Sequence, residues 1–569
     1  MKYLLFTTLF LALAAGLRAQ DLGKIGKTKP FTITGNIGGG LSFYHSTENL
    51  YTQPPFAWNL YANFTPSVYG FSFPFSFVLT QYSNSYTTPF AQFGVSPTYK
   101  WIKLDLGYRT INMSPLVFGG QSFLGAGLEL TPGIFRFAAF YGSLNKAVSE
   151  DTTTGHLAQP QFGRKGYGMK VGIGTEANHF DILYFHARDD SGSIKLVTDT
   201  AVIRPQDNTV LGAGFKLSLL KRRIVWSGDM AASAITQDLA ASKVNRDTLT
   251  NTFDKFASRL IDYRNSTVVS FAGQTLFSFF LKTFNTTLGY RRVQPDFHSL
   301  GIPYMLNDFQ TFQWNAGLIL AKGKLNLNAN LNDQETGVSG KEASKLNAFT
   351  GSLNLGAMMS AHANLSVALS TVDISQADGT AHVSDTVREA EQVYSISVTP
   401  NFTFGSVAVL SSLSISASVS VLRDNNPFTS PGTSSNTMTG LLSYTCSFTK
   451  QSWSLTASAM GNRYAQDTNV YASIGLNLGG GAQLLKKKNL GFQLTAGYLI
   501  NHYTLSAVSN NITGSANIHY SPAKHHSFSA YFNLVSTPPT SNYLNLQQKL
   551  PYAVSTTNLA GGLSYNYSF

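Results

Sequence analysis

Apolar and polar residues alternate one by one along most of the chain, which is the period of a β-strand with two unlike faces. The alternation is clearest over residues 71–77, 325–332 and 413–421, where Phe, Leu, Ile or Val residues are separated by Ser, Asn or Pro. From Phe31 onward about 26 such segments follow one another, a series longer than a sandwich of two sheets holds. The pattern predicts an all-β chain in which one sheet closes on itself.

The connections between these segments are alternately long and short, as in barrels that carry long loops on one side of a membrane and tight turns on the other. This rhythm predicts a closed antiparallel barrel with an even number of strands and both termini on the periplasmic side. The long connections are expected at 44–55, 145–166, 189–208, 235–265, 293–308, 333–345, 373–392, 424–436 and 536–558. The short ones are expected at 131–133, 175–179, 221–223, 321–323, 450–452 and 486–488.

Composition indicates whether this barrel lies in water or in a membrane. Only 12% of residues are charged and 43% are hydrophobic, whereas soluble proteins carry about 25% charged residues. Beyond the first twenty residues no apolar stretch reaches the ~18 residues that a membrane-spanning helix needs. A chain that is poor in charge and has no spanning helix crosses a membrane as a closed barrel, because every backbone polar group must then be paired within the sheet.

The two ends of the chain carry export signals. Lys2, an apolar run and the small residue Ala19 predict a cleaved signal peptide over residues 1–20, followed by a short periplasmic segment at 21–29. The barrel is then expected to occupy residues 30–569, in the outer membrane of a Gram-negative bacterium. The final strand ends in register on Tyr565, Tyr567 and Phe569, which resembles the signal recognised by the outer-membrane assembly machinery.

One long connection breaks the strand pattern. Leu249, Phe253, Phe256 and Leu260 recur at helical spacing, which predicts an amphipathic helix over residues 246–263. A circular barrel of about 26 strands has a diameter on the order of 50 Å, which would leak proteins and toxic solutes. We therefore expect the lumen to be flattened or occluded by the barrel's own long loops, chiefly the helix-bearing connection 235–265. A helix that only packs its own loop is the alternative.

Assigning residues to faces places most charges of the first half of the chain in the lumen. If the turn at Pro132-Gly133 centres its hairpin, Glu129 lies opposite Arg136 as a cross-strand ion pair. The inward positions of the second half are mostly Ser, Thr and Asn. The charged side is interpreted as a solute path or a docking wall, with ordinary solvation by ion pairs as the alternative. The expected lumen-facing charges are Lys103, Asp105, Arg109, Glu129, Arg136, Lys170, Asp181, His186, Arg188, Lys216, Asp229 and Arg291.

The remaining chemistry excludes several functions. No GxSxG, HExxH, paired-cysteine or Walker motif occurs, so we expect no enzymatic activity, no metal and no cofactor. The formal net charge is +12, but the basic residues stand singly or in short turns, and nucleic-acid binding is not expected. Cys446 is the only cysteine, in register with lipid-facing positions, so no internal disulfide forms. The expected partners are outer-membrane lipid and lipopolysaccharide, with a plug protein or a surface protein left open.

One part of the chain resembles a known family. The run FGVSPTYKWIKLDLGYRTINMSPLVFGGQSFLGAGLELTPGIFRFAAFYGSLNKAV at 93–148, continued by LGYRRVQPDFHSLGIPYMLND at 288–308, is similar to a functionally uncharacterised family of large outer-membrane β-barrels. The resemblance is clearest over residues 30–310 and implies fold and location. The segment before the first strand is too short for the plug domain of a TonB-dependent transporter. The expected function is a channel or transport barrel for solutes, and the alternative is a non-conducting barrel that anchors surface or secreted proteins.

Overall fold

The computed structural model describes residues 30–47, 54–81, 92–149, 160–194, 203–302, 304–504, 506–541 and 553–569. The expected signal peptide and the segment 21–29 lie outside these residues. Most of the described residues form strands, and the helical elements are short: η2 (Arg246–Thr248), α2 (Thr252–Ala257), η3 (Ala321–Gly323) and α3 (Ser430–Thr433).

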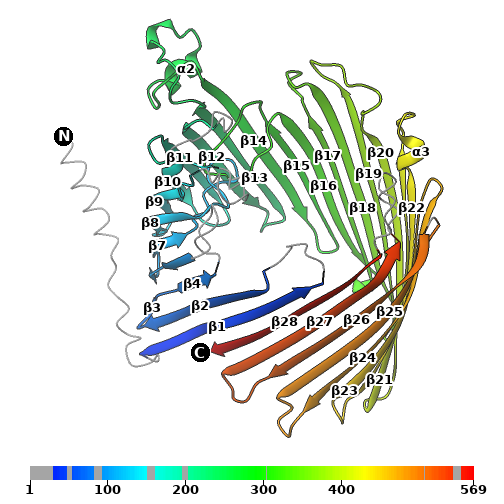
Figure 1. Ribbon diagram of the computed structural model, residues 1–569. Coiled ribbons are helices and arrows are strands. Elements are labelled where there is room, and N and C mark those ends of the chain that lie inside the picture. Colours follow the sequence, from blue (N-terminus) through cyan, green and yellow to red (C-terminus); the bar gives the residue numbers. More distant parts are fainter. Residues whose placement is uncertain are drawn as a thin grey trace.

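The strands run in chain order around one sheet (Figure 1). The first part holds β1 (Phe31–Ser46), β2 (Phe56–Val68), β3 (Phe71–Ser72), β4 (Phe75–Thr80), β5 (Gln92–Val95), β6 (Thr98–Tyr99), β7 (Ile102–Arg109), β8 (Phe123–Leu130), β9 (Phe135–Asn145), β10 (Gly163–Gly174), β11 (His179–Asp190), β12 (Asp207–Leu219), β13 (Ile224–Thr236) and β14 (Thr267–Phe280). The second part holds β15 (Phe284–Val293), β16 (Phe309–Leu320), β17 (Leu325–Thr336), β18 (Ser344–Ser360), β19 (Ala363–Asp378), β20 (Ala390–Gly405), β21 (Val409–Asp424), β22 (Ser435–Phe448), β23 (Trp453–Gln466), β24 (Asn469–Leu484), β25 (Leu490–Tyr503), β26 (Ser506–Tyr520), β27 (His526–Ser541) and β28 (Ala553–Ser568).

Two of these strands are interrupted by proline. β3 and β4 both pair with β2, and β5 and β6 both pair with β7, so each couple is one strand broken at Pro74 or Pro97. Proline has no N–H to give to the ladder, which accounts for both breaks. The 28 segments are therefore 26 strands, all antiparallel, and pairing of β1 with β28 closes the sheet. The predicted closed barrel of about 26 strands is confirmed.

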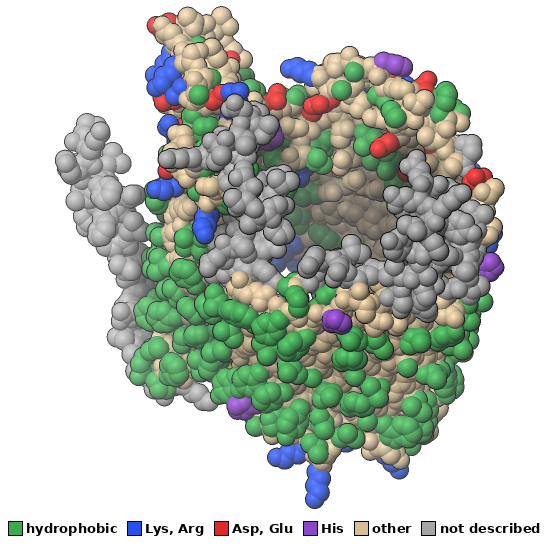
Figure 2. Space-filling view, viewed as in Figure 1, with side chains coloured by type: hydrophobic (Ala, Val, Ile, Leu, Met, Phe, Trp, Pro, Cys, Tyr) green, Lys and Arg blue, Asp and Glu red, His purple; other side chains and the backbone are tan. Residues whose placement is uncertain are grey.

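Alternation sorts the side chains onto an apolar outer face and an inner face. On β24, Ile474, Leu476 and Leu478 are each more than 60% exposed on the outer face. Figure 2 shows that such apolar side chains form a broad belt around the lower part of the barrel. An exposed apolar belt of this kind is stable only in contact with hydrocarbon, so this barrel spans a membrane.

The two ends of the barrel differ. Both ends of the described chain lie together at the end that carries the short connections, where Phe569 donates its N–H to the carbonyl of Gly35 at 2.9 Å. We call this the short-turn end and the opposite one the long-loop end. The long-loop end carries connections such as 237–266 and 294–308, whereas the connection Asp467-Thr468 on the same side is only two residues long.

The hairpin of β8 and β9 departs from the predicted register. Glu129 pairs with Ala138, two positions beyond Arg136. The turn is closed by a hydrogen bond from the N–H of Phe135 to the carbonyl of Pro132, 3.1 Å long, so Gly133 and Ile134 form its corners. Gly133 takes a φ of +64°, the left-handed conformation that hairpin turns favour at this corner. The predicted centre at Pro132-Gly133 is therefore wrong by one residue, which moves the register by two.

Candidate functional site

Two connections from the long-loop end fold into the lumen. The first inner loop comprises residues 110–122, and the second comprises residues 294–302 and 304–308. In the first, Phe118 is fully buried, and its ring lies 4.3 Å from that of Phe140 and 5.5 Å from that of Phe185, centroid to centroid. Phe140 faces inward, because the next residue, Tyr141, is 61% exposed on the outer face. The loop thus packs against the inside of the wall.

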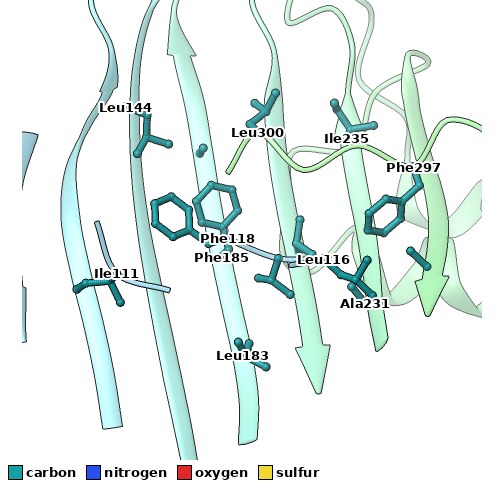
Figure 3. Close-up of a cluster of buried hydrophobic side chains, with 14 of the residues drawn as sticks. Ile111, Leu116, Phe118, Leu144, Leu183, Phe185, Ala231, Ile235, Phe297 and Leu300 are labelled. Carbon is teal, nitrogen blue, oxygen red and sulfur yellow. The ribbon is translucent and has the colours of Figure 1, made fainter. Parts of the chain in front are cut away.

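An apolar cluster forms between the inner loops and the strands β8 to β16. Figure 3 shows this cluster, with Phe118 of the first loop beside Phe185 of the wall and Phe297 of the second loop at the other side of the cluster. Phe118, Phe185 and Phe297 have no exposed surface. Burying apolar side chains stabilises each loop by roughly 1.5–3 kcal/mol per large residue. The lumen therefore has a solid apolar filling along one side.

Hydrogen bonds tie the second inner loop to the wall. The side chain of Asn208 on β12 accepts from the N–H of Leu300 at 3.0 Å. On β13, Ser233 donates to the carbonyl of His298 at 2.5 Å. Asn208 and Ser233 are both buried, and their side chains are joined at 2.8 Å. Because unmade hydrogen bonds are costly where water is excluded, these contacts hold the loop in one position.

The two inner loops also hold each other. Ser299 donates its hydroxyl to the carbonyl of Val117 at 2.5 Å, and the N–H of Gly119 donates to the carbonyl of Gly301 at 3.4 Å. Gly301 lies so close to the first loop that a Cβ there would stand 2.7 Å from Cδ2 of Phe118. Only glycine fits this contact, so the loops form one interlocked constriction.

The helix-bearing connection takes a different position from the one expected. The helix runs only from Thr252 to Ala257. Ala257 of the helix and Ile261 after it pack against Ala234 and Val269 of the wall. Those wall residues lie on the outer face, since their neighbours Ser233 and Ser270 face inward. Figure 1 shows α2 standing above the rim of the barrel. The connection 237–266, which we call the projection, does not enter the lumen, and the prediction that it is the chief plug is wrong.

The four residues expected to form the plug helix are correspondingly dispersed. Leu249 follows η2 and precedes α2, and Leu260 follows α2, so neither lies in a helix. Phe253 is 56% exposed and touches Phe271 on the outer face with its ring, 5.0 Å between centroids. Phe256 is 51% exposed. The helical spacing is real over one turn, but the helix begins only after its N-cap Asn251 and ends at Ala257, so it has six residues.

The expected lumenal charges near the short-turn end form ion pairs, with partners other than the expected ones. Lys103 reaches Glu129 at 2.7 Å and Asp105 at 3.2 Å. Arg136 binds both carboxylate oxygens of Asp181, at 2.8 and 3.0 Å. The expected Glu129–Arg136 pair is absent, because the shifted register leaves Glu129 nearer to Lys103 on the neighbouring strand β7 and Arg136 nearer to Asp181 on β11, across β10.

Other expected lumenal charges are placed singly on the inner face. Arg109 donates to the hydroxyl of Ser76 at 2.6 Å. Asp229 accepts from Ser114 of the first inner loop at 3.0 Å, which anchors that loop to β13. Arg291 stacks over the ring of Phe309. Lys170 pairs in register with Ala138 and Leu183, and Lys216 pairs with His179 and Ser227, which places both on this face.

Two of the expected lumenal residues lie on the other face. His186 and Arg188 share their side of β11 with the exposed Phe180 and Ile182, whereas Asp181 points inward. β11 pairs with both neighbours without a bulge, so residues of odd and even number cannot share a face. The assignment of His186 and Arg188 to the lumen is therefore wrong. His186 bonds Thr209 at 2.9 Å on the outer face.

The wall opposite the inner loops is polar and almost uncharged. From β17 to β27 most inward positions carry hydroxyl or amide side chains, many of them hydrogen-bonded across the strands, with a few apolar residues such as Val393, Leu422 and Leu441 between them. Ser395 bonds Ser420 at 2.8 Å, and Thr495 bonds Ser515 at 2.6 Å. Glu391 and Asp424 are inward charges of this wall, and both stand at its long-loop end.

A cavity of about 1150 Å³ lies at the long-loop end, above the inner loops. Five amide side chains line it: Gln121, Asn145, Gln161, Gln206 and Gln237. Its two arginines are neutralised, Arg164 by Asp189 at 2.7 Å and Arg204 by Asp238. The N–H of Ala240 and the guanidinium of Arg204 hold the pKa of Asp238 below its usual range, so this pair is ionised at neutral pH. We call this cavity the vestibule.

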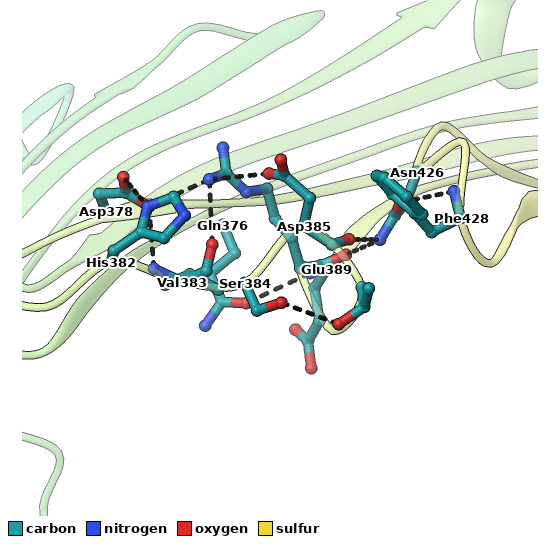
Figure 4. Close-up of polar contacts among 11 residues, drawn as sticks. Gln376, Asp378, His382, Val383, Ser384, Asp385, Glu389, Asn426 and Phe428 are labelled. Atoms are coloured by element: carbon teal, nitrogen blue, oxygen red, sulfur yellow. Dashed lines mark hydrogen bonds and ion pairs between the residues drawn. The ribbon is translucent and has the colours of Figure 1, made fainter.

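On the opposite side of the mouth, hydrogen bonds join two neighbouring connections (Figure 4). Asn426, which precedes α3, donates to the carbonyls of Asp385 and Arg388 at 2.7 and 2.9 Å. Asp378 binds His382 and Arg388. Among the described residues, no group of three or more His, Cys, Asp or Glu is placed to hold a metal ion.

The inner loops and the vestibule were not anticipated from the sequence. A signal for the first loop existed in Leu116, Val117 and Phe118, three apolar residues between Pro115 and two glycines, at a place where a solvated loop would be polar. The vestibule gave no such signal, because its amides come from segments far apart in the chain.

Comparison with known proteins reaches only the level of the barrel. No protein-family model and no curated protein matches the chain. Among solved structures, it is similar to OccAB2 of Acinetobacter baumannii at 9% identity and a TM-score of 0.32, covering 64% of this chain and 92% of that one. OpdK of Pseudomonas aeruginosa, solved with vanillate, gives 9% and 0.31, covering 64% and 94%.

A third similar structure is Wzi of Escherichia coli, described as an outer-membrane protein involved in group 1 capsule assembly and a carbohydrate-binding β-barrel. It shares 12% identity at a TM-score of 0.31, covering 60% of this chain and 81% of that one. Among the described residues no helix is long and apolar enough to cross a membrane.

Proposed function

We propose that this protein is an outer-membrane channel for uncharged polar solutes, with its short-turn end in the periplasm and its lumen narrowed by the two inner loops. The observation that carries the proposal is the asymmetry of the lumen. One side is filled by the interlocked loops, and the other is a wall on which hydroxyl and amide groups predominate. A polar lumen is the property that separates a solute path from a packed core.

The solute class follows from the charges of the path. Two lumenal cations near the short-turn end are paired with carboxylates, in Lys103–Glu129 and Arg136–Asp181, whereas Lys170 and Lys216 stand singly on the inner face. The vestibule offers amides and two neutralised arginines. Amide side chains both donate and accept hydrogen bonds, which suits the hydroxyl groups of sugars and other polyols. Among the described residues, the lumenal cations without a carboxylate partner stand singly and form no ring that would select for an ion of one sign.

Liposome swelling tests this function. Proteoliposomes of the full chain are placed in isotonic solutions of neutral sugars of rising size, and of lysine or glutamate at the same osmolarity. We expect swelling with small sugars, faster than with either charged amino acid. Equal exclusion of all solutes, with the barrel folded by circular dichroism, would contradict passage.

A non-conducting platform for surface or secreted proteins is the second candidate. The observation that favours it is the projection, which carries the exposed side chains of Phe253 and Phe256 near the long-loop end of the wall. Large apolar side chains held in water frequently mark a protein contact. Swelling distinguishes the two functions, because a platform barrel would exclude every solute while retaining its fold.

A further inference from the structure

The short-turn end carries nearly the whole net charge of the protein. Its twelve connections contain twelve Lys or Arg residues and a single acidic residue, Glu176, while the formal net charge of the chain is +12. Figure 2 shows Lys and Arg side chains projecting from the lower end of the barrel, below the apolar belt. The basic residues are Lys100, Lys221, Arg222, Arg223, Lys282, Lys322, Lys324, Lys450, Lys486, Lys487, Lys488 and Lys524.

The charges of these cations are not neutralised within the barrel, although Lys100 lies over the ring of Tyr99, 5.3 Å from its centroid. All twelve are exposed, and among the described residues none of them forms an ion pair. By contrast, apart from Glu176, the acidic residues that the structure describes lie in the lumen or towards the long-loop end, where many are paired. Twelve like charges around one rim repel one another, so an isolated rim would be destabilised. An anionic partner would remove this repulsion.

Exposed apolar residues stand beside the cations in the same turns. Leu220 precedes the cluster 221–223 and is 68% exposed, and Leu485 precedes 486–488 and is 57% exposed. Leu281 precedes Lys282 in the same way and is also exposed. An apolar residue directly followed by lysine is the arrangement that sits at a membrane surface, where the chain is half in hydrocarbon and half among headgroups.

We call the twelve cations of the short-turn end the basic rim. We infer that the basic rim is a binding site for anionic phospholipid headgroups, in the leaflet that surrounds the short-turn end. The cations occur in seven of the twelve short connections, from Lys100 to Lys524 around the barrel. A ring of this kind faces the surrounding leaflet on all sides, whereas a docked acidic protein would need one contiguous patch. The leaflet around the long-loop end is not the partner, because the rim lies on the far side of the apolar belt.

Brominated lipids measure this binding independently of solute passage. Three of the five tryptophans, Trp101, Trp226 and Trp453, lie within a few residues of the basic turns. The full chain is reconstituted in phosphatidylcholine bilayers that contain equal fractions of either brominated phosphatidylglycerol or brominated phosphatidylcholine. The tryptophan quenching by the two lipids is then compared at low and high salt.

We expect the ratio of quenching by the anionic lipid to quenching by the neutral lipid to exceed about two at low salt and to fall towards one at 0.5 M salt. Replacing six of the rim cations should lower the ratio, because they lie beside Trp226 and Trp453. The test variant is K221Q/R222Q/R223Q/K486Q/K487Q/K488Q. The matched control removes six exposed cations at the long-loop end and should leave the ratio unchanged: K146Q/K243Q/R246Q/K255Q/R259Q/K341Q.

A quenching ratio of one for the wild-type chain would overturn the inference, since the rim would then bind anionic and neutral lipids equally. An equal fall in the ratio for the test and control variants would also overturn it, because the effect would then depend on net charge alone. The wild-type measurement stands by itself if a variant fails to fold.

Discussion

The strand register decides which partner each charged side chain on the inner wall of this barrel meets. Arg136 and Asp181 lie on β9 and β11, separated by β10, and meet in two parallel hydrogen bonds across it. Both side chains are largely buried, with 18% and 8% of their surface exposed. Glu129, only one strand away from Arg136, instead pairs with Lys103 in a more exposed setting. The two ion pairs should therefore differ in what they contribute to stability.

Removing the partner of a buried charge tests this difference. We expect R136A to lower the free energy of unfolding by about 1–3 kcal/mol, because Asp181 is left buried without its cation. E129A should cost less than about 1 kcal/mol, since Lys103 keeps Asp105 and some access to water. The measurement is urea unfolding in detergent micelles, followed by tryptophan fluorescence.

A double-mutant cycle on the same residues tests the register. We expect coupling between Arg136 and Asp181 of roughly 0.5–3 kcal/mol, and coupling between Glu129 and Arg136 within about 0.5 kcal/mol of zero. Strong coupling between Glu129 and Arg136 would show that the hairpin adopts the register with Pro132-Gly133 at its centre.

A single methyl group should loosen the constriction. In G301A the new Cβ would lie 2.7 Å from Phe118, 2.9 Å from Phe185 and 2.9 Å from the carbonyl of Val117, so one of the loops must move. We expect a loss of about 1–3 kcal/mol and faster entry of large sugars in the swelling assay. G440A is the control, because nothing lies within 4 Å of its Cβ. Unchanged sugar entry in G301A would mean that the loops do not limit the path.

Among the elements, the strands follow from sequence pattern and the connections do not. Residues 413–421 alternate without exception, so the faces of β21 are decided locally by the pleat. Residues 246–263 also show a regular pattern, but the pattern does not say what the apolar side packs against. In the folded chain Ala257 and Ile261 find the outer face of β13 and β14. Where a loop packs is decided by tertiary contacts, and the same apolar spacing occurs in a loop that folds inward and in one that folds outward.

Deleting the projection should accordingly have little effect on permeability. Removing residues 240–262 takes away contacts with the outer face, while the inner loops keep their hydrogen bonds to Asn208, Ser233 and Asp229. We expect unchanged swelling rates for all sugars in this variant, provided that the strands β13 and β14 still pair. A marked rise in the entry of large sugars would show that the projection is the element that blocks the lumen.

At the scale of the whole molecule, the low charge and the alternation were enough to predict a closed membrane barrel. The expected width of this barrel further predicted that its own loops narrow the lumen. The identity of those loops was beyond the sequence, because Phe118, Phe185 and Phe297 come together from segments nearly 180 residues apart. The errors at His186 and Arg188 have a simpler origin. They arose from assigning residues on β11 without keeping strictly to its two-residue period.

The central claim is that solutes pass through a lumen whose width is limited by the two inner loops. Single-channel conductance in planar bilayers tests it most directly, with the wild-type chain compared with a variant in which residues 296–306 are replaced by Gly-Gly. That deletion removes Phe297, Leu300 and Gly301 and leaves Val293 and Phe309 paired across β15 and β16. We predict discrete conductance steps for the wild-type chain and clearly larger steps for the deletion variant. Identical steps in both, or no conductance in either while the barrel remains folded, would contradict the account.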